Sequence, residues 1–367
     1  MYATVKQGKL TVSANYSYDY YDSRNRKSSN QYEFTGDPHT PSAYNRTQTG
    51  KSRSYNHTHS GGFEASYDID TLRLVTASLG IWSNRSRSHN TYTTNATSPL
   101  TAAPLYAYTN SGRSVSDYMY MDGSIDYQRI FKLPGRMLTL SYKLNGGTDN
   151  GDYNSAYDVM EVTDDWLAFM NRLRDERRDD DGRSMEHTLQ VDYTTPIAKA
   201  HTMEMGVKYI FRDNRSNDDR YIRPNGTSDE YVFDDEYSTH YRHENDILAA
   251  YLGYGLKLGK LSGRLGVRYE HTFQKIKYAL GVGENFSTDF DDVVPSVSLG
   301  YRLNDAQSLR LGYNMRIYRP GIWSLNPYLD QTNPESLSQG NPNLVSEKNH
   351  NVQFTYNLFA SRFSTSW

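Results

Sequence analysis

Residues 309–317 read LRLGYNMRI, and this stretch decides the fold class because apolar and polar residues alternate through it. The same two-residue rhythm recurs in residues 138–145, LTLSYKLN, and in residues 75–81, VTASLGI. Successive side chains of a β-strand point to opposite faces, so each stretch predicts a strand with one apolar and one polar face. We therefore expect an all-β protein.

There are about twelve alternating segments, and the connections between them alternate between short and long. Residues 133–135, 259–260 and 304–305 are predicted short turns, whereas residues 150–184 form the largest insertion. A barrel of the bacterial outer membrane has short turns at its periplasmic end and long loops at its outer end. The pattern predicts a transmembrane antiparallel up-and-down β-barrel in the bacterial cell outer membrane, of which these strands are one part.

The composition excludes a helical membrane protein and permits a barrel. The mean hydropathy is -0.81 and 23% of the residues are charged, but only every second residue of a barrel strand faces lipid. The chain has 33 Tyr against 12 Phe and 4 Trp, and tyrosine suits the aromatic girdles at a lipid boundary. The absence of Cys excludes a disulfide scaffold, and the net charge of -3 gives no case for nucleic-acid binding.

The polar faces of the predicted strands carry charges of both signs. An Arg or Lys facing lipid near the midplane would cost roughly 2–4 kcal/mol, so these side chains are expected to face the interior of the barrel. The residues predicted to face the lumen are Glu204, Lys208, Arg264, Arg268, Arg310 and Arg316. Mixed signs favour a plugged or hydrated lumen over a filter of one sign, although a porin wall has a similar pattern.

A spaced motif follows the stretch 309–317. Its residues are Arg319, Pro320, Leu325, Asn326, Pro327, Gly340, Asn341, Pro342, Leu344 and Glu347. It resembles the RP…LNP…GNP-L-x-x-E signature of the outer-membrane β-barrel family related to TonB-dependent receptors, which is abundant in Bacteroidetes. The resemblance implies a barrel of about 22 strands, occluded by an N-terminal plug, that imports a scarce ligand with energy delivered by TonB.

The same resemblance sets the expected partners and extent of the domain. The partners are outer-membrane lipid, the TonB complex through a plug, and a small-molecule or oligomeric ligand such as a siderophore, glycan or peptide. The sequence contains neither a plug nor a TonB-contact segment. We therefore expect residues 1–367 to be one β-barrel domain of a longer product, with the plug and the terminal strands outside it.

Several functional alternatives stay open at this level. Energised uptake competes with a passive porin-like channel, a structural outer-membrane barrel and a secreted β-rich adhesin. The prolines of the motif predict rigid bends, which either fold the loop over the barrel mouth or present it to a ligand.

The insertion at 150–184 predicts a short helix. Thr163 or Asp164 can cap it, and Trp166, Leu167, Met170 and Leu173 recur at helical spacing. One interpretation is an amphipathic helix packed on the barrel rim. The other makes Trp166 and Phe169 part of an extracellular lid that closes over captured ligand.

No motif of catalysis or cofactor binding is found. The chain has no G-x-S-x-G elbow and no Gly-rich phosphate loop after a strand. His57 and His59 share one face of a predicted strand, but two ligands without a third do not define a metal site. We expect no enzyme, catalytic residue, cofactor or bound metal.

Overall fold

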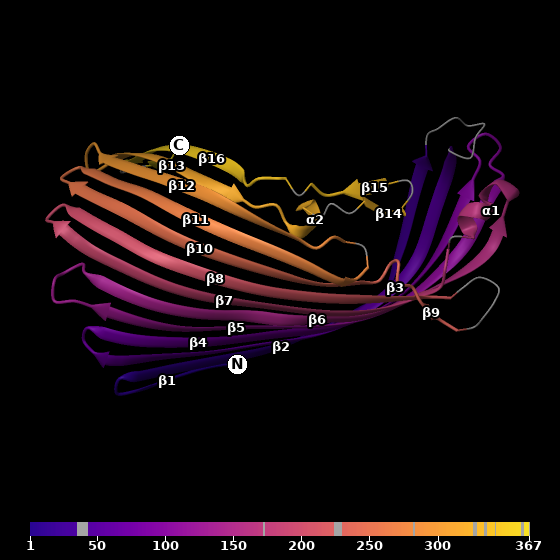
Figure 1. The fold of residues 1–367 in the computed structure, drawn as a ribbon, viewed down its shortest axis with the longest axis horizontal. Helices are drawn as coiled ribbons and strands as arrows, with labels where there is room; N and C mark the ends of the chain where they lie inside the picture. Colours follow the sequence, from indigo (N-terminus) through magenta and orange to yellow (C-terminus); the bar gives the residue numbers. More distant parts are fainter. Residues whose placement is uncertain are drawn as a thin grey trace.

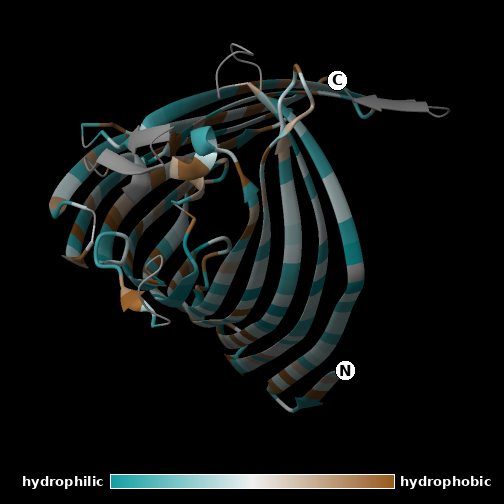
Figure 2. Cartoon of the chain, turned by 90° about the vertical axis from the view of Figure 1, so that its right-hand side faces the viewer, coloured by the Kyte–Doolittle hydropathy of each residue, from teal (hydrophilic) through white to brown (hydrophobic). Residues whose placement is uncertain are grey.

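The computed structural model describes residues 1–34, 43–171, 173–223, 230–281, 283–325, 329–333, 336–341, 343–360 and 363–366. Within this part of the chain, 15 strands form one antiparallel sheet, in which strands consecutive in sequence pair with each other apart from one two-residue strand off the path. The sheet is strongly curved and is open between its edge strands β1 and β17 (Figures 1 and 2). The all-β, up-and-down antiparallel architecture is thereby confirmed.

The first half of the sheet consists of one short strand followed by seven long strands. They are β1 (Tyr2–Gln7), β2 (Leu10–Phe34), β3 (Tyr44–Asp70), β4 (Arg73–Thr97), β5 (Pro104–Ile130), β6 (Met137–Val162), β7 (Glu176–Ala198) and β8 (His201–Ile222).

The strands become shorter toward the C-terminus. They are β9 (Val232–Phe233), β10 (Thr239–Leu258), β11 (Leu261–Leu280), β12 (Phe286–Arg302), β13 (Gln307–Tyr318), β16 (Glu347–Ala360) and β17 (Phe363–Ser366). A separate pair, β14 (Leu329–Asn333) and β15 (Ser336–Gln339), lies between β13 and β16 with the short helix α2 (Ile322–Leu325).

The predicted strands correspond to β2–β8, β10–β13 and β16, and the structure adds β1, β9, β14, β15 and β17. One prediction about the loops was wrong. The insertion predicted at 150–184 is mostly strand, because most of it lies in β6 and β7, and the polar residues at the end of β2 likewise remain strand as far as Phe34. These polar strand segments are still paired with neighbouring strands, because the hydrogen bonds between strands join backbone groups and do not depend on apolar side chains.

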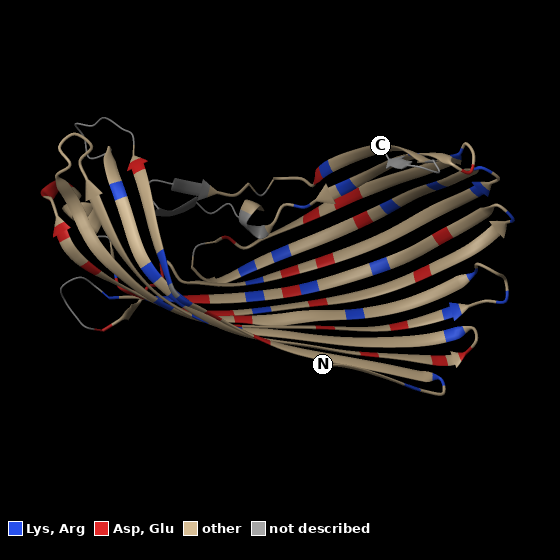
Figure 3. Cartoon of the chain, turned by 180° about the vertical axis from the view of Figure 1, so that it is seen from behind, with Lys and Arg blue, Asp and Glu red and all other residues tan. Residues whose placement is uncertain are grey.

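The short turns lie together at one end of the sheet. Gly8 and Gly259 have φ of 59° and 54° in the turns that lead into β2 and β11, a conformation that glycine adopts without steric cost. Lys9, Lys132, Lys199 and Lys260 lie in four of these turns, and Figure 3 shows the resulting line of basic residues. By the rule for bacterial barrels, this end is periplasmic.

The sheet has one apolar and one polar face, as the alternation predicts. Leu265 and Val267 of β11 are 50% and 46% exposed, and they lie on the face that we call outer. Arg264 and Arg268 alternate with them, so they lie on the opposite, inner face. No register shift interrupts the pairing from β11 through β12 and β13 to β16, so both faces are continuous there.

The outer apolar belt covers only the part of the sheet near the short turns. In β4 it ends near Ile81, and the strand continues to Thr97 as the polar extension. The helix α1 (Asp164–Met170) packs on this extension, where Trp166 and Met170 join Ala96 and Tyr106 in a small buried core. Among the described residues, no helix is long and apolar enough to cross a membrane.

Candidate functional site

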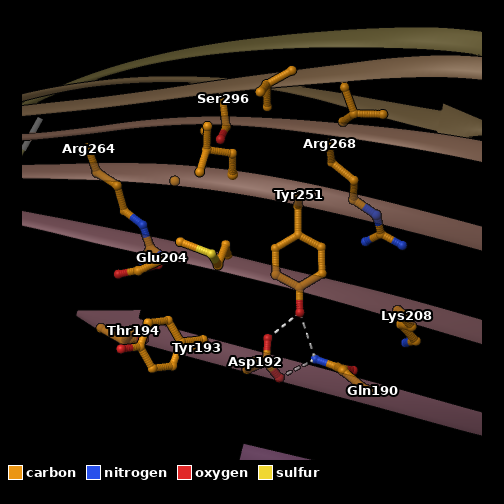
Figure 4. A pocket seen from close by; sticks show the side chains of 16 residues that line it. Gln190, Asp192, Tyr193, Thr194, Glu204, Lys208, Tyr251, Arg264, Arg268 and Ser296 are labelled. Carbon is orange, nitrogen blue, oxygen red and sulfur yellow. Dashed lines mark hydrogen bonds and ion pairs between the residues drawn. The ribbon is translucent and has the colours of Figure 1, made fainter. Parts of the chain in front are cut away.

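Four of the predicted lumen residues line one hollow on the inner face. Glu204, Lys208, Arg264 and Arg268 surround a space of about 580 Å³ together with residues of β7, β10 and β12 (Figure 4). We call this space the inner hollow. Arg310 and Arg316 of β13 also lie on the inner face. They alternate in step with Gly312, which belongs to the same row across the sheet as Ser298 and Arg264.

Hydrogen bonds and ion pairs fix the wall of the inner hollow. Arg264 pairs with Glu204, and Arg268 Nε lies 2.5 Å from Glu270 Oε1. The Tyr251 hydroxyl donates to Asp192, and Gln190 Nε2 donates to the same carboxylate over 2.8 Å. The wall therefore presents charged groups of both signs and polar groups, all held in place by their neighbours.

The position of Tyr251 depends on a glycine in the adjacent strand. A Cβ atom placed on Gly206 would lie 2.4 Å from Cζ of Tyr251, which is closer than such atoms approach. The missing side chain lets the ring cross β8 and reach Asp192 of β7. This close approach explains why a central strand position is occupied by glycine.

Several cations on the inner face of β8 to β13 lack an ion-pair partner among the described residues. Lys208, Arg310 and Arg316 make no salt bridge there, whereas Glu204, Glu270 and Asp292 are all within salt-bridge distance of an arginine. The inner face of β8 to β13 therefore has unbalanced positive charge.

The motif loop is anchored to the inner wall by its arginine. Arg319 Nη2 donates to Glu270 and lies 3.6 Å from Asp292 Oδ2. The Ser346 hydroxyl, at the other end of the loop, donates to the same Asp292 oxygen over 2.9 Å. The side chains of Glu270 and Asp292 are only 8% and 2% exposed, so this network is shielded from water. It ties both ends of the loop to β11 and β12.

The rest of the motif closes the loop on itself. Pro320 and Leu325 are buried, and Asn341 N donates to Ser324 O over 2.7 Å. Gly340 is half-buried, Leu344 is 38% exposed, and Glu347 begins β16 opposite Tyr318. The predicted motif residues Asn326, Pro327 and Pro342 lie outside the described residues.

The two predicted lid residues differ in burial. Trp166 is 8% exposed, and its ring lies 4.9 Å from that of Tyr106 and 5.0 Å from that of Tyr44. Phe169 is 38% exposed and contacts Trp166 edge-on. Thr163 is the N-cap by position, without a side-chain cap hydrogen bond. A role of these residues as a lid stays a prediction.

Acidic residues gather on the inner face of the polar extension. Asp180 of β7 is paired in register with Asp218 of β8, and both line a hollow of about 420 Å³ with Asp149. Burial, followed by the charge of Asp218, raises the pKa of Asp180 to about 6. The residue lies beyond the outer apolar belt, which ends in β7 at Leu189.

One group in the described part of the chain has metal-ligating spacing. His271, Asp289 and Asp291 place ligand atoms within 4.8 Å of one another on the outer face. His271 Nδ1 lies 3.0 Å from Asp291 Oδ1, and the Tyr269 hydroxyl donates to that oxygen over 2.5 Å. His271 and Asp291 thus already contact each other and Tyr269.

Sequence reasoning missed the residues that complete the inner hollow. Asp192, Gln190 and Tyr251 have the parity of the inner face, but the register that joins β7, β8 and β10 is not readable from the sequence. Gly206 was the available signal, since an isolated glycine in a strand marks a close approach.

Comparison with known proteins identifies the family. The model of the outer membrane protein beta-barrel family matches residues 129–367, and this chain belongs to that family. The protein is accordingly a β-barrel protein of the bacterial outer membrane. A search of curated proteins found no match.

Solved structures with a similar fold are outer-membrane receptors and transporters. The siderophore receptor PiuA from Acinetobacter baumannii is 9% identical, with a TM-score of 0.47 over 97% of this chain and 55% of that chain. The alcaligin receptor FauA from Bordetella pertussis is 14% identical, with a TM-score of 0.44 over 93% and 49%. The ferric citrate transporter FecA is 11% identical, with a TM-score of 0.45 over 90% and 48%. The chain thus spans about half the length of each.

Proposed function

We propose that this chain forms part of the wall of a TonB-dependent receptor, which takes up a scarce ligand such as a siderophore, glycan or peptide across the outer membrane. The observation that carries the proposal is the inner wall, where Lys208, Arg310 and Arg316 lack ion-pair partners among the described residues. Uncompensated cations of a wall are suited to bind a plug or a ligand inside the barrel.

The anchored motif loop supports the same proposal. Arg319, Glu270 and Asp292 hold the loop after β13 against the inner wall, in a network with little exposure to water. Diffusion through a passive pore does not require a loop fixed to the inner wall, whereas a fixed loop gives a receptor a preorganised surface for its ligand. The family membership is consistent with this role and carries no information about the ligand.

Uptake in cells separates energised import from a passive channel. The full-length protein is expressed in an outer-membrane host with and without a working TonB system, and uptake of labelled ferric siderophores, oligosaccharides and peptides is measured. We expect uptake of one class, and its loss without TonB.

Electrical recording gives the second arm of this test. The full-length protein in a planar bilayer is expected to conduct little at rest. Steady conductance together with TonB-independent uptake would overturn the proposal and assign a porin-like channel instead. The same preparations show no turnover of the tested compounds if the protein is a transporter without enzymatic activity.

A further inference from the structure

A second hollow lies on the outer face, where the apolar belt gives way to the polar extension. It has a volume of about 660 Å³ and is bounded by β2 to β6. We call it the outer hollow. The residues on which it depends are Tyr18, His57, His59, Ser83, Arg85 and Asp117.

The strand register arranges these residues in two rows across the sheet. His57, Arg85, Asp117 and Asn150 are paired in succession from β3 to β6. His59, Ser83, Met119 and Thr148 form the next row toward the periplasmic end. Ser83 is small and lies between His59 and Met119, which leaves the depression between larger side chains.

The next outer-face row toward the periplasmic end belongs to the apolar belt. It contains Ile81 and Met121, which are 46% and 39% exposed on the same face. Arg85 is twelve residues from the start of β4 at Arg73, about 40 Å along the strand and about 30 Å along the barrel axis at a tilt near 40°. Since the apolar band is about 25 Å tall, the outer hollow lies at the level of the lipid headgroups.

The hydrogen bonds leave donors for an anion. The hydroxyls of Tyr18 and Tyr16 lie 2.8 Å from Nδ1 of His57 and His59, respectively. In the neutral ring a hydroxyl that donates to Nδ1 leaves the proton on Nε2, and the charged ring carries that proton as well. Where the tyrosine hydroxyl is the donor, each imidazole offers an Nε2–H, and Arg85 is paired with His57 in the register of β3 with β4.

The one arginine of the outer hollow stays accessible to an anion. Asp117, its one carboxylate, pairs with Arg85 over 3.2 Å, and both side chains stay about half exposed. Arginine and imidazole donors suit a phosphate, whereas serine, threonine and asparagine side chains suit sugar hydroxyls. Ile81, Met119 and Met121 offer an apolar surface for acyl chains directly below.

We propose that the outer hollow binds the headgroup of a phosphorylated glycolipid of the outer leaflet. His57, His59 and Arg85 contact the phosphate, Asp117 and Asn150 contact the sugar, and the acyl chains lie on Ile81 and Met121. The assignment depends on the location in the outer membrane and not on the proposed transport function.

Binding of the lipid to the full-length protein tests this assignment. The detergent-purified protein, stripped of bound lipid, is mixed with vesicles of phosphatidylcholine that contain lipopolysaccharide, dephosphorylated lipopolysaccharide or neither, and bound glycolipid is quantified. We expect retention of intact lipopolysaccharide, a loss of at least five-fold in Arg85→Gln and in the double variant His57→Gln/His59→Gln, and increased retention in Asp117→Asn.

Arg87→Gln is the matched control, because Arg87 is the next cation on the outer face of β4 and does not line the outer hollow. Heat-dependent electrophoretic mobility checks that each variant is folded. Equal retention by wild type and Arg85→Gln would overturn the proposal. So would equal retention of the dephosphorylated lipid, or displacement by millimolar inorganic phosphate that reveals a site for the free anion.

Discussion

Gly206 of β8 provides the space in which the ring of Tyr251 of β10 lies, and Tyr251 thereby reaches Asp192 of β7. Three neighbouring strands are connected in this way by one side chain on the inner face. The inner hollow thus has a wall that is fixed by packing as well as by charge.

Replacing Gly206 with Val is expected to displace Tyr251 and break its hydrogen bond to Asp192. Forcing a side chain into occupied space costs typically 1–3 kcal/mol, so urea unfolding of the protein in micelles should shift to lower concentration. Gly312→Val is the control, since a Cβ there meets only Gln353 O at 3.9 Å. Equal effects of both substitutions would contradict the packing argument.

The two faces of the sheet predict opposite responses to a new charge. Val267→Arg places a cation on the outer face within the apolar belt, and we expect a loss of roughly 2–4 kcal/mol in the free energy of unfolding from lipid vesicles. Asn314→Arg places the same side chain on the inner face, in the row next to that of Val267. It should change stability much less, and a similar loss in both variants would contradict the assignment of the faces.

Removing the loop anchor is expected to free the loop without unfolding the sheet. Arg319→Ala leaves the buried Asp292 without its arginine, while Arg268 still neutralises Glu270. Removing one partner of a buried ion pair costs about 3–5 kcal/mol, and proteases should cleave between residues 319 and 346. Arg316→Ala, which removes an arginine with no ion pair among the described residues, should leave the loop resistant. Unchanged resistance in Arg319→Ala would show that other contacts hold it.

Trp166→Ala is expected to loosen α1 on the polar extension. Truncation of a buried Trp typically costs 3–5 kcal/mol, and the loss should appear as rapid proteolysis between residues 163 and 175. Phe169→Ala removes a more exposed ring and should have a smaller effect. A larger effect of Phe169→Ala on ligand binding than on proteolysis would favour the lid hypothesis.

The elevated pKa of Asp180 gives the polar extension a pH dependence. The folded-state value of about 6 exceeds the unfolded value of 3.8, so the folded state binds more protons between these values. Stability of the extension therefore falls as the pH rises through this window. Asp180→Asn should be more protease-resistant than wild type at pH 7.5, by less than about 1 kcal/mol, and equal to it near pH 4. Asp181→Asn, the neighbour on the other face, serves as control.

The alternation in the sequence predicts the strands, their order and the face of each side chain, because each of these follows from a period of two. Arg264 and Leu265 illustrate the success, since adjacent residues lie on opposite faces as expected. The polar extension was missed because serine-rich strands such as residues 44–58 have no apolar face to reveal them. These residues are strand because their backbones pair with β2 on one side and β4 on the other.

The network of Arg319, Glu270 and Asp292 shows a second limit of sequence reasoning. The three residues share neither a strand nor a local motif, and only the register of β11 with β12 and the path of the loop bring them together. The parity of Glu270 places it on the same face as Arg268, but parity does not name its partner. The burial of Trp166 depends on Tyr44 and Tyr106 in the same way.

The decreasing strand length has a consequence for what the cell displays. β3 has 27 residues, about 90 Å of chain, whereas β13 has 12, which is little more than the lipid requires. The rim is therefore tall over the N-terminal strands and low over β12 and β13. Antibodies and bacteriophages that approach such a cell would meet mainly the tall side, so variation under immune or viral selection should concentrate in residues 22–56 and 83–118.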